Sequence, residues 1–198
     1  SKMKAALFFF FSLLEIVAEI GGSSLGFIKE ISLSHCYKSI PSDIKKITIL
    51  IFISELLSKS ISESEVDTEL FNFIYDSMVW LDETTSDYVN LPLVFAMQLS
   101  KFLGFFPNLD TYSEELCFDL LDGNFKKWDN DIYQINNELS KAFFLISQQS
   151  LLNNNLQTSR FCDLNTRRLL LDAIVTYYKL HADNVRDIKS VEVLREIF

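Results

Sequence analysis

The segment that follows Pro41 constrains the fold of this chain more than any other, because its apolar side chains recur at helical spacing on more than one face. Pro41 suits the first turn of a helix, and Ser42 and Asp43 favour its N-terminal end. A helix that is apolar on several faces lies inside a core. We therefore expect a central helix that ends at a polar linker, residues 60–65, and carries its apolar residues at Ile44, Ile47, Leu50, Ile51, Leu56 and Leu57.

Further segments repeat this helical spacing, and few residues would interrupt it. Only five glycines and three prolines accompany eighteen phenylalanines and seven tyrosines, which favours long packed elements over a turn-rich β architecture. Asn153–Asn155 is expected to be a break. The pattern predicts helices at 69–81, at 89–102 with Pro92 about one turn in, at 131–150, at 166–181 with Asp163 or Asn165 as its cap, and after Ser190, which is expected to cap a short terminal helix.

Two parts of the chain indicate strands. Residues 7–20 and 25–33 flank Gly-Gly-Ser-Ser and are expected to form two strands joined by a turn. Asp122-Gly123 between apolar runs predicts a second hairpin. The expected fold class is α+β, mostly α: a bundle of about five helices with a small β hairpin insertion, preceded by N-terminal strands.

The charge balance limits what this domain can bind. With 27 acidic and 18 basic residues the net charge is −9, which argues against holding nucleic acid over a wide surface, because clustered Lys and Arg make the phosphate contacts. Trp128 beside two lysines could stack on a base, or the group could be a solvated hairpin end. From the local basic patches we expect DNA contacts at Lys2, Lys4, Lys126, Lys127, Arg167, Arg168 and Lys189.

The sequence contains no pattern typical of catalysis or metal binding. It lacks a nucleophile elbow, a phosphate-binding loop and a dinucleotide fingerprint. Cys36, Cys117 and Cys162 are far apart and form no CxxC pair, so we expect reduced, mostly buried thiols. His35 and His181 have no neighbouring cysteine or paired histidine. We expect no enzyme activity, no metal and no cofactor.

The start of the chain imitates a signal peptide only in part. Lys2 and Lys4 precede an apolar run over residues 5–14, but Glu15 and Glu19 follow within the apolar pattern and no small-residue cleavage site appears. The run is also shorter than the roughly 20 residues that a membrane-spanning helix needs. We expect no membrane contact, and the first Met at position 3 is typical of a fragment that lacks its natural N-terminus.

Glu55 is the one charged residue inside the apolar run of the central helix. A buried carboxylate without a partner costs several kcal/mol, so it needs one. Lys59 lies four residues on and shares its face. The two interpretations are a structural ion pair at the edge of the buried face and a contact with a partner protein.

Several sequence blocks, in this order, resemble the RecO family of bacterial recombination mediators and DNA repair proteins. The resemblance spans nearly every residue. The blocks are Lys4–Leu7 with the apolar strand after it, Ser54–Leu57, Glu69–Phe71, Leu99–Phe105 with Pro107, and Ile188–Phe198.

The resemblance implies an OB-fold followed by a helical domain. Residues 1–38 would be the last strands of the OB-fold lobe, and residues 39–198 the helical domain. It implies a cytoplasmic, nucleoid-associated, non-enzymatic protein that binds single- and double-stranded DNA, mainly through its OB lobe, and anneals complementary strands. Its partners would be the acidic C-terminal tail of single-stranded-DNA-binding protein and RecR, with which it helps to load the recombinase.

Two departures from the family pattern affect the expected sites. Many relatives hold a four-cysteine zinc site between the third helix and the hairpin, whereas residues 105–125 contain only Cys117. Relatives that bind the acidic tail carry basic residues at the start of the third helix, whereas this chain has leucines there. We expect the tail to contact Leu93, with charge from Lys45 and Lys101. The alternative is a helical protein-interaction or oligomerisation domain without a nucleic-acid role, whose aromatic residues form an interface.

Overall fold

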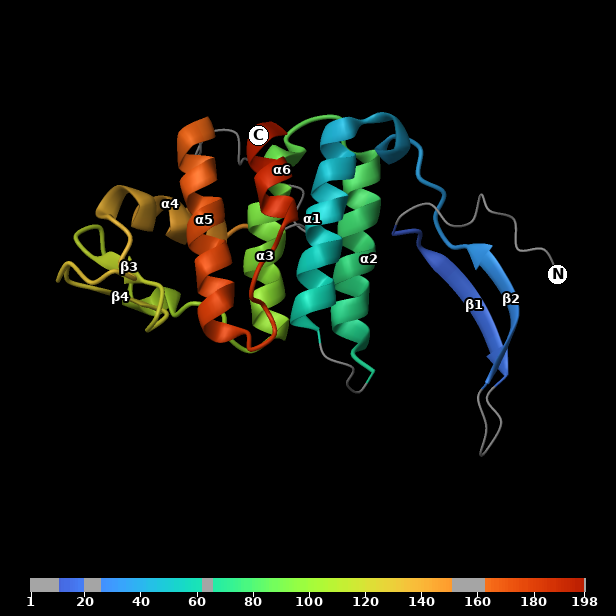
Figure 1. Ribbon diagram of the computed structural model, residues 1–198, viewed down its shortest axis with the longest axis horizontal. Helices are drawn as coiled ribbons and strands as arrows, with labels where there is room; N and C mark the ends of the chain where they lie inside the picture. Colours follow the sequence, from blue (N-terminus) through green and yellow to red (C-terminus); the bar gives the residue numbers. More distant parts are fainter. Residues whose placement is uncertain (1–10, 20–25, 62–65, 151–162, 198) are drawn as a thin grey trace.

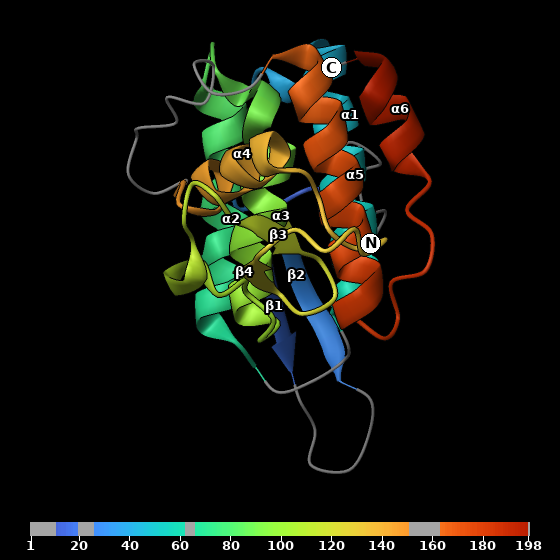
Figure 2. The same ribbon diagram turned by 90° about the vertical axis from the view of Figure 1, so that its left-hand side faces the viewer.

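The computed structural model describes residues 11–19, 26–61, 66–150 and 163–197. This part of the chain is a helical bundle with a small β hairpin at each end (Figure 1). Its fold is α+β and mostly α, as the sequence predicts. Seen from one end, the hairpin β3–β4 and helix α4 stand in front of the bundle and the other hairpin behind it (Figure 2). None of the described helices is both long and apolar enough to cross a membrane.

The N-terminal hairpin consists of β1 (Leu14–Glu19) and β2 (Phe27–Leu33). The two strands pair antiparallel with one irregularity in the register, which confirms the predicted pair. The first strand begins later than expected, because residues 11–13 are not part of it. Residues 7–10 and 20–25, which the prediction also covered, lie outside the described residues.

The segment that leaves β2 is attached to α2 (Thr68–Glu83) by one carboxylate. Asp82 is buried and accepts backbone N–H hydrogen bonds from residues 38, 39 and 40 at 2.9–3.0 Å, while His35 Nε2 lies 3.1 Å from its Oδ2. Burial would raise the pKa of Asp82, but these hydrogen bonds outweigh burial and hold the pKa well below its usual range. We call this arrangement the Asp82 clasp; it fixes the chain between the hairpin and the bundle.

Two helices form the centre of the bundle. α1 (Ile44–Ser60) begins after Asp43, whose carboxylate caps it by accepting two backbone N–H groups, and packs against α2, α3 and α6. α3 (Leu91–Phe102) is enclosed further, since every residue from Leu91 to Ser100 is buried. The prediction of a central first helix is therefore confirmed, and α3 shares that position. Two details of the prediction are wrong: Ile44 and Ile51 are exposed, and Pro41 lies in a separate 3-10 turn, Ile40–Ser42, before α1.

The third helix starts two residues later than predicted. Tyr88–Asn90 form a 3-10 turn, and Pro92 lies in the first turn of α3. Proline lacks an N–H, but the first N–H groups of a helix have no intrahelical acceptor anyway, so Pro92 fits this position. Gly104 follows the helix with a φ of +81°, a conformation in which glycine is favoured.

The second hairpin consists of β3 (Cys117–Asp119) and β4 (Asn124–Lys126), as Asp122-Gly123 predicts. Gly123 has a φ of +68°, a conformation that favours glycine, and a Cβ there would lie 3.1 Å from Tyr177 Oη, so a larger residue would also press against that hydroxyl. The two strands, their turn and residues 127–136 form a small lobe beside α4 and α5.

The fourth helix is shorter than the predicted 131–150. α4 spans Asn137–Ser147 and is capped by Asn136. Residues 131–136 instead extend the hairpin lobe: Gln134 forms a β-bridge with Asp119, and Ile135 N donates to Phe118 O at 3.0 Å. Backbone pairing with β3 therefore overrides the helical spacing. The predicted break at Asn153–Asn155 lies outside the described residues.

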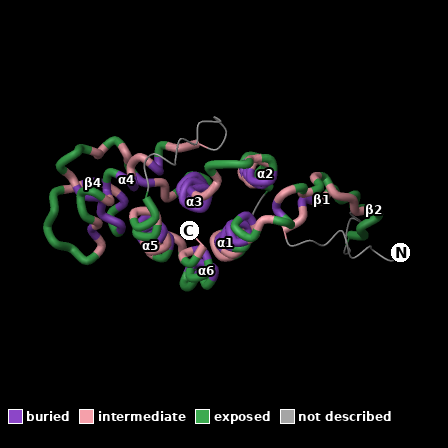
Figure 3. Tube along the Cα trace, turned by 90° about the horizontal axis from the view of Figure 1, so that it is seen from above, coloured by how far each residue is buried: buried purple, intermediate pink, exposed green. Residues whose placement is uncertain are grey.

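The chain ends in an antiparallel pair of helices. α5 (Leu164–His181) is capped by Asp163, one of the two predicted caps, and α6 (Ser190–Ile197) lies between α1 and α5 in the view from above (Figure 3). The prediction that Ser190 caps α6 is wrong, because Ser190 is its first residue and its hydroxyl donates to Glu55. Glu55 also pairs with Lys59 at 2.8 Å, which confirms the structural interpretation of that carboxylate.

Candidate binding pocket

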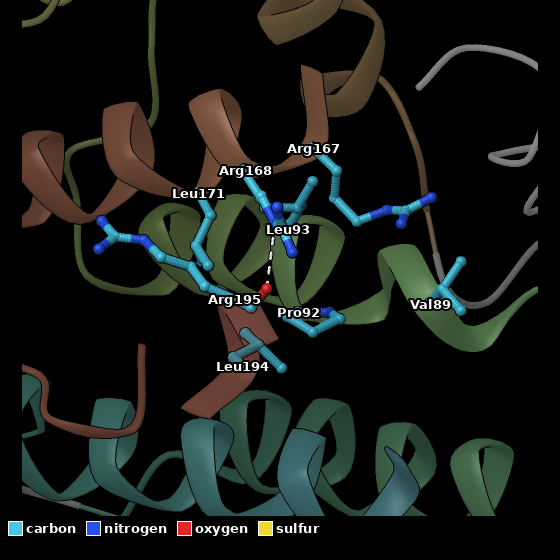
Figure 4. A pocket seen from close by; sticks show the side chains of 8 residues that line it. All are labelled: Val89, Pro92, Leu93, Arg167, Arg168, Leu171, Leu194 and Arg195. Carbon is cyan, nitrogen blue, oxygen red and sulfur yellow. Dashed lines mark hydrogen bonds between the residues drawn. The ribbon is translucent and has the colours of Figure 1, made fainter. Parts of the chain in front are cut away.

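A hollow opens where α3, α5 and α6 meet, near the N-terminal end of α3 (Figure 4). Its walls are apolar and come from three separate parts of the sequence, while its rim carries three guanidinium groups. Helical geometry places the residues of α5 on one side, because positions three and four apart share a face. The lining residues are Val89, Pro92, Leu93, Arg167, Arg168, Leu171, Leu194 and Arg195.

Hydrogen bonds from different elements hold the three arginines. Arg167 Nε donates to Oδ1 of the buried Asn90 at 2.6 Å, which ties α5 to the turn before α3. Arg168 Nε donates to the backbone oxygen of Arg195 at 3.0 Å, and Figure 4 shows this bond reaching across from α5 to the end of α6. The Arg195 guanidinium pairs with Asp172 of α5. The rim therefore depends on how α5 and α6 are placed.

The hollow is shallow. Its volume is about 10 Å³, which is room for about one water molecule. A cofactor would not fit without rearrangement of the walls. A single apolar side chain could enter if the arginine side chains at the rim moved aside, and their exposure allows this: Arg168 is exposed and Arg167 and Arg195 are half-buried.

The chemistry of the hollow favours a ligand that places an anionic group next to an apolar one. Guanidinium groups keep their charge at any relevant pH and match the fork of a carboxylate or phosphate. Leu93, Leu171 and Leu194 are each at least 96% buried, so they provide a dry apolar floor. The rim is locally basic in a chain whose net charge is −9. Asp172 offsets the charge of Arg195, so Arg167 and Arg168 contribute most of the positive charge that favours an anionic ligand.

The structure brings together three residues that the sequence analysis placed in different roles. Leu93, expected to contact a protein tail, lines the same hollow as Arg167 and Arg168, which were expected to contact DNA. Lys45 and Lys101, expected to supply charge beside Leu93, do not line it. Lys45 is exposed in the first turn of α1, and the Lys101 ammonium lies 4.5 Å from the centre of the Phe106 ring.

The other predicted DNA contacts lie apart from the hollow. Lys126 Nζ is 2.8 Å from Asp119 and 3.0 Å from Asp122, and these carboxylates raise its pKa above the usual range and offset its charge. Lys127 is exposed beside the half-exposed Trp128. Lys189 is exposed at the start of α6, and Lys2 and Lys4 lie outside the described residues.

Sequence reasoning missed five of the eight lining residues, which are Val89, Pro92, Leu171, Leu194 and Arg195. None of them, nor Asn90, which holds Arg167, carried a signal that separated it from core or ordinary surface residues. Leu171 follows Arg168 by three positions and shares its helix face. That spacing could have predicted that Arg168 and Leu171 lie side by side on α5. Only the fold shows that α6 completes the hollow beside them.

The thiols and histidines do not form a metal site in the part of the chain that the structure describes. No group of three or more His, Cys, Asp or Glu residues there could hold a metal ion. Cys117 is buried, and burial raises the pKa of its thiol, whereas Cys36 is exposed against expectation. Cys162 lies outside the described residues. His181 is in hydrogen-bonding distance of Leu120 O, at 2.9 Å.

Comparison with known proteins identifies the relatives of this chain. The family model "Recombination protein O C terminal" matches residues 41–190. A protein of Bacteroides fragilis named DNA repair protein RecO is 34% identical over 99% of this chain and 81% of its own length. Proteins of the same name from Christiangramia forsetii and Flavobacterium psychrophilum are 32% and 31% identical over the whole chain and 81% of their own lengths. No solved structure matches significantly.

Proposed function

This chain belongs to the RecO family of DNA repair proteins, and from that premise we propose that it is a non-enzymatic mediator of DNA repair by homologous recombination. In this role it binds single- and double-stranded DNA, anneals complementary strands and helps RecR to load the recombinase. Residues 1–38 contribute the last strands of an OB lobe, which makes most of the DNA contact. Residues 39–198 form the helical domain, which binds protein partners.

The hollow between α3, α5 and α6 is the proposed site for the acidic tail of single-stranded-DNA-binding protein. The observation that carries this assignment is the combination of an apolar floor at Leu93, Leu171 and Leu194 with three arginines on one rim. A tail that ends in phenylalanine offers a matching pair of groups: an aromatic ring for the floor and a terminal carboxylate for the guanidiniums. Acidic residues before the phenylalanine would meet the rest of the rim.

Entry of the phenylalanine ring requires a small local change. Arg168 bridges to the backbone oxygen of Arg195 across the hollow. A ligand carboxylate is a better acceptor for a guanidinium than a neutral carbonyl oxygen, because it carries the opposite charge and can accept two parallel N–H hydrogen bonds. Arg168 therefore turns from the α6 carbonyl to the ligand when the tail binds.

DNA contact by the helical domain is a smaller part of the proposal. Arg167, Arg168 and Lys189 are basic residues on the α5–α6 side of the bundle, and they could continue a DNA path from the OB lobe. Lys126 is a weaker candidate, since two carboxylates lie within 3.0 Å of its ammonium. Lys2 and Lys4 remain proposed contacts of the lobe.

The test is a fluorescence-anisotropy titration with an acidic peptide that ends in phenylalanine, at about 50 and 200 mM salt. We expect saturable binding that weakens with salt, because part of the attraction lies between exposed charges. Arg168→Glu should weaken binding at least tenfold. Lys141→Glu is the matched control: it reverses the charge of an exposed lysine on α4, which does not line the hollow, and we expect less than a twofold change.

Two outcomes would contradict this assignment. Equal losses in Arg168→Glu and Lys141→Glu would indicate a general charge effect without a specific pocket. No binding of either peptide or single-stranded DNA by the unmodified protein would favour the alternative, a helical interaction or oligomerisation domain without a nucleic-acid role.

A further inference from the structure

Glu55 holds the start of α6 from a neighbouring helix. Its carboxylate, which lies on α1, accepts hydrogen bonds from Lys189 N at 3.0 Å, from Ser190 N at 2.8 Å and from Ser190 Oγ at 2.7 Å. Lys59 Nζ lies 2.8 Å from Oε1, the same carboxylate oxygen that accepts Lys189 N, while both Ser190 groups donate to Oε2. Burial would raise the pKa of Glu55, but these four partners outweigh it and lower the pKa to about 2. We call this arrangement the Glu55 clasp.

The Glu55 clasp supplies what the sequence of α6 lacks. The first N–H groups of a helix need acceptors, and a side chain just before the helix usually provides one. Here Lys189 occupies that place and cannot accept a hydrogen bond. Glu55 provides the acceptor from α1 instead, and its negative charge also suits the positive end of the α6 dipole. Helix α6 is therefore both capped and attached by one residue.

The far end of the same helix forms one wall of the hollow. Leu194 contributes to the apolar floor, and the Arg195 backbone oxygen accepts the bond from Arg168. Because α6 has only eight residues, its two ends move together as one rigid element. Release of its start from α1 would displace Leu194 and Arg195 and open the hollow on that side.

We infer that Glu55 is a positioning residue for the ligand site: it touches no ligand, but it holds α6 where Leu194 and Arg195 complete the hollow. This inference rests on the proposed function for the identity of the ligand. It also explains why two sequence blocks far apart, around Glu55 and around Ser190, lie together in the fold. The Glu55 clasp on α1 therefore keeps the ligand site complete by holding α6 in place.

Peptide binding by matched variants tests the inference. If loss of the clasp leaves α6 docked in about a tenth of the molecules, the apparent affinity falls about tenfold, because only docked molecules have a complete site. We expect Glu55→Ala to weaken binding of the acidic, phenylalanine-ended peptide about tenfold, and Glu55→Gln, which keeps one acceptor oxygen, to weaken it less. Asp82→Asn is the control: it damages a similar clasp on α2 that does not touch α6, and should change the affinity less than twofold.

Hydrogen exchange without any ligand tests the same inference separately. In Glu55→Ala the amides of residues 191–197 should exchange at least tenfold faster, while those in the middle of α5 keep their protection. Unchanged exchange in α6 would overturn the positioning role. Fast exchange in α6 with full peptide affinity would overturn the link to the site. If the unmodified protein binds no peptide, the proposed function fails, and the exchange result alone decides whether Glu55 places α6.

Discussion

The two clasps, at Glu55 and at Asp82, each attach a peripheral segment to the bundle through hydrogen bonds to a carboxylate. Their sequence contexts differ, because Glu55 interrupts an apolar run and Asp82 lies at a polar helix end. Each is a carboxylate on a helix that accepts backbone N–H groups from a segment distant in the chain. Asp82 is buried and holds three consecutive N–H groups with His35 beside it, whereas Glu55 is half-buried, holds two N–H groups and a hydroxyl, and pairs with Lys59. Because Asp82 is the more buried carboxylate, its loss should destabilise the fold more than the loss of Glu55, whose main effect is on the position of α6.

The largest expected effect comes from removing the more buried carboxylate. Asp82→Ala would leave the N–H groups of residues 38–40 without their acceptor, and each unsatisfied buried group costs on the order of 1–3 kcal/mol, less where water enters. We expect the free energy of unfolding to fall by about 3 kcal/mol in urea denaturation. Glu83→Ala, at the exposed neighbouring position, should change it by less than about 0.5 kcal/mol. Equal effects at the two positions would contradict the Asp82 clasp.

Acid should weaken both clasps, and the sign follows from their lowered pKa values. A carboxylate whose pKa is lower in the folded state stabilises fully above its unfolded pKa, near 4.3 for Glu, and loses this contribution as pH falls through the folded value. For Glu55, with a folded pKa of about 2, the loss by pH 3 is about 2 kcal/mol. Asp82 adds a loss in the same direction.

Urea titrations at pH 6, 4 and 3 measure this effect. The unmodified protein should lose stability steeply over the interval, and Glu55→Gln should lose about 2 kcal/mol less, because Gln does not titrate. Lys38→Gln serves as a control, since only its backbone takes part in the Asp82 clasp. If the free energy of unfolding of Glu55→Gln fell with pH as steeply as that of the unmodified protein, the pKa of Glu55 would not be lowered in the folded state.

The smallest expected effects come from single partners within the Glu55 clasp. Ser190→Ala removes one hydroxyl bond to the carboxylate and should cost about 1 kcal/mol. Lys59→Met removes a partly exposed ion pair and should cost less than about 1 kcal/mol. Thermal unfolding resolves both against Glu55→Ala, whose effect should exceed either one. If Ser190→Ala destabilised the protein as much as Glu55→Ala, the attachment of α6 would depend on the Ser190 hydroxyl and not on the backbone N–H groups.

The contrast between the clasps also shows what sequence could predict. Glu55 interrupts an apolar run, so the cost of burying a charge marks it as needing a partner. Asp82 lies in the stretch Leu81-Asp82-Glu83-Thr84, where a carboxylate at a helix end resembles any solvated charge. Only the return of residues 38–40 to that helix end, a tertiary contact, reveals its role.

The candidate site shows the same limit on what the sequence alone can predict. Leu93, Arg167 and Arg168 could be selected from their types and from local patches, but the roles assigned to them were separate. The charges expected beside Leu93 were placed on Lys45 and Lys101, because no local pattern relates α3 to α5 across about 70 residues of sequence. Helical spacing predicted most elements; it failed at residues 131–136, where pairing with β3 replaces the helix.

The most direct test of the central claim, recognition of a terminal carboxylate by the rim of the hollow, compares two peptides. An acidic, phenylalanine-ended peptide is titrated with its terminal carboxylate free and with that group amidated, against the unmodified protein, Arg168→Gln and Lys141→Gln. We predict that the unmodified protein and Lys141→Gln prefer the free carboxylate about tenfold, the scale of one charge-assisted hydrogen bond, and that Arg168→Gln shows less than a twofold preference. A full preference in Arg168→Gln, or none in the unmodified protein, would contradict the claim.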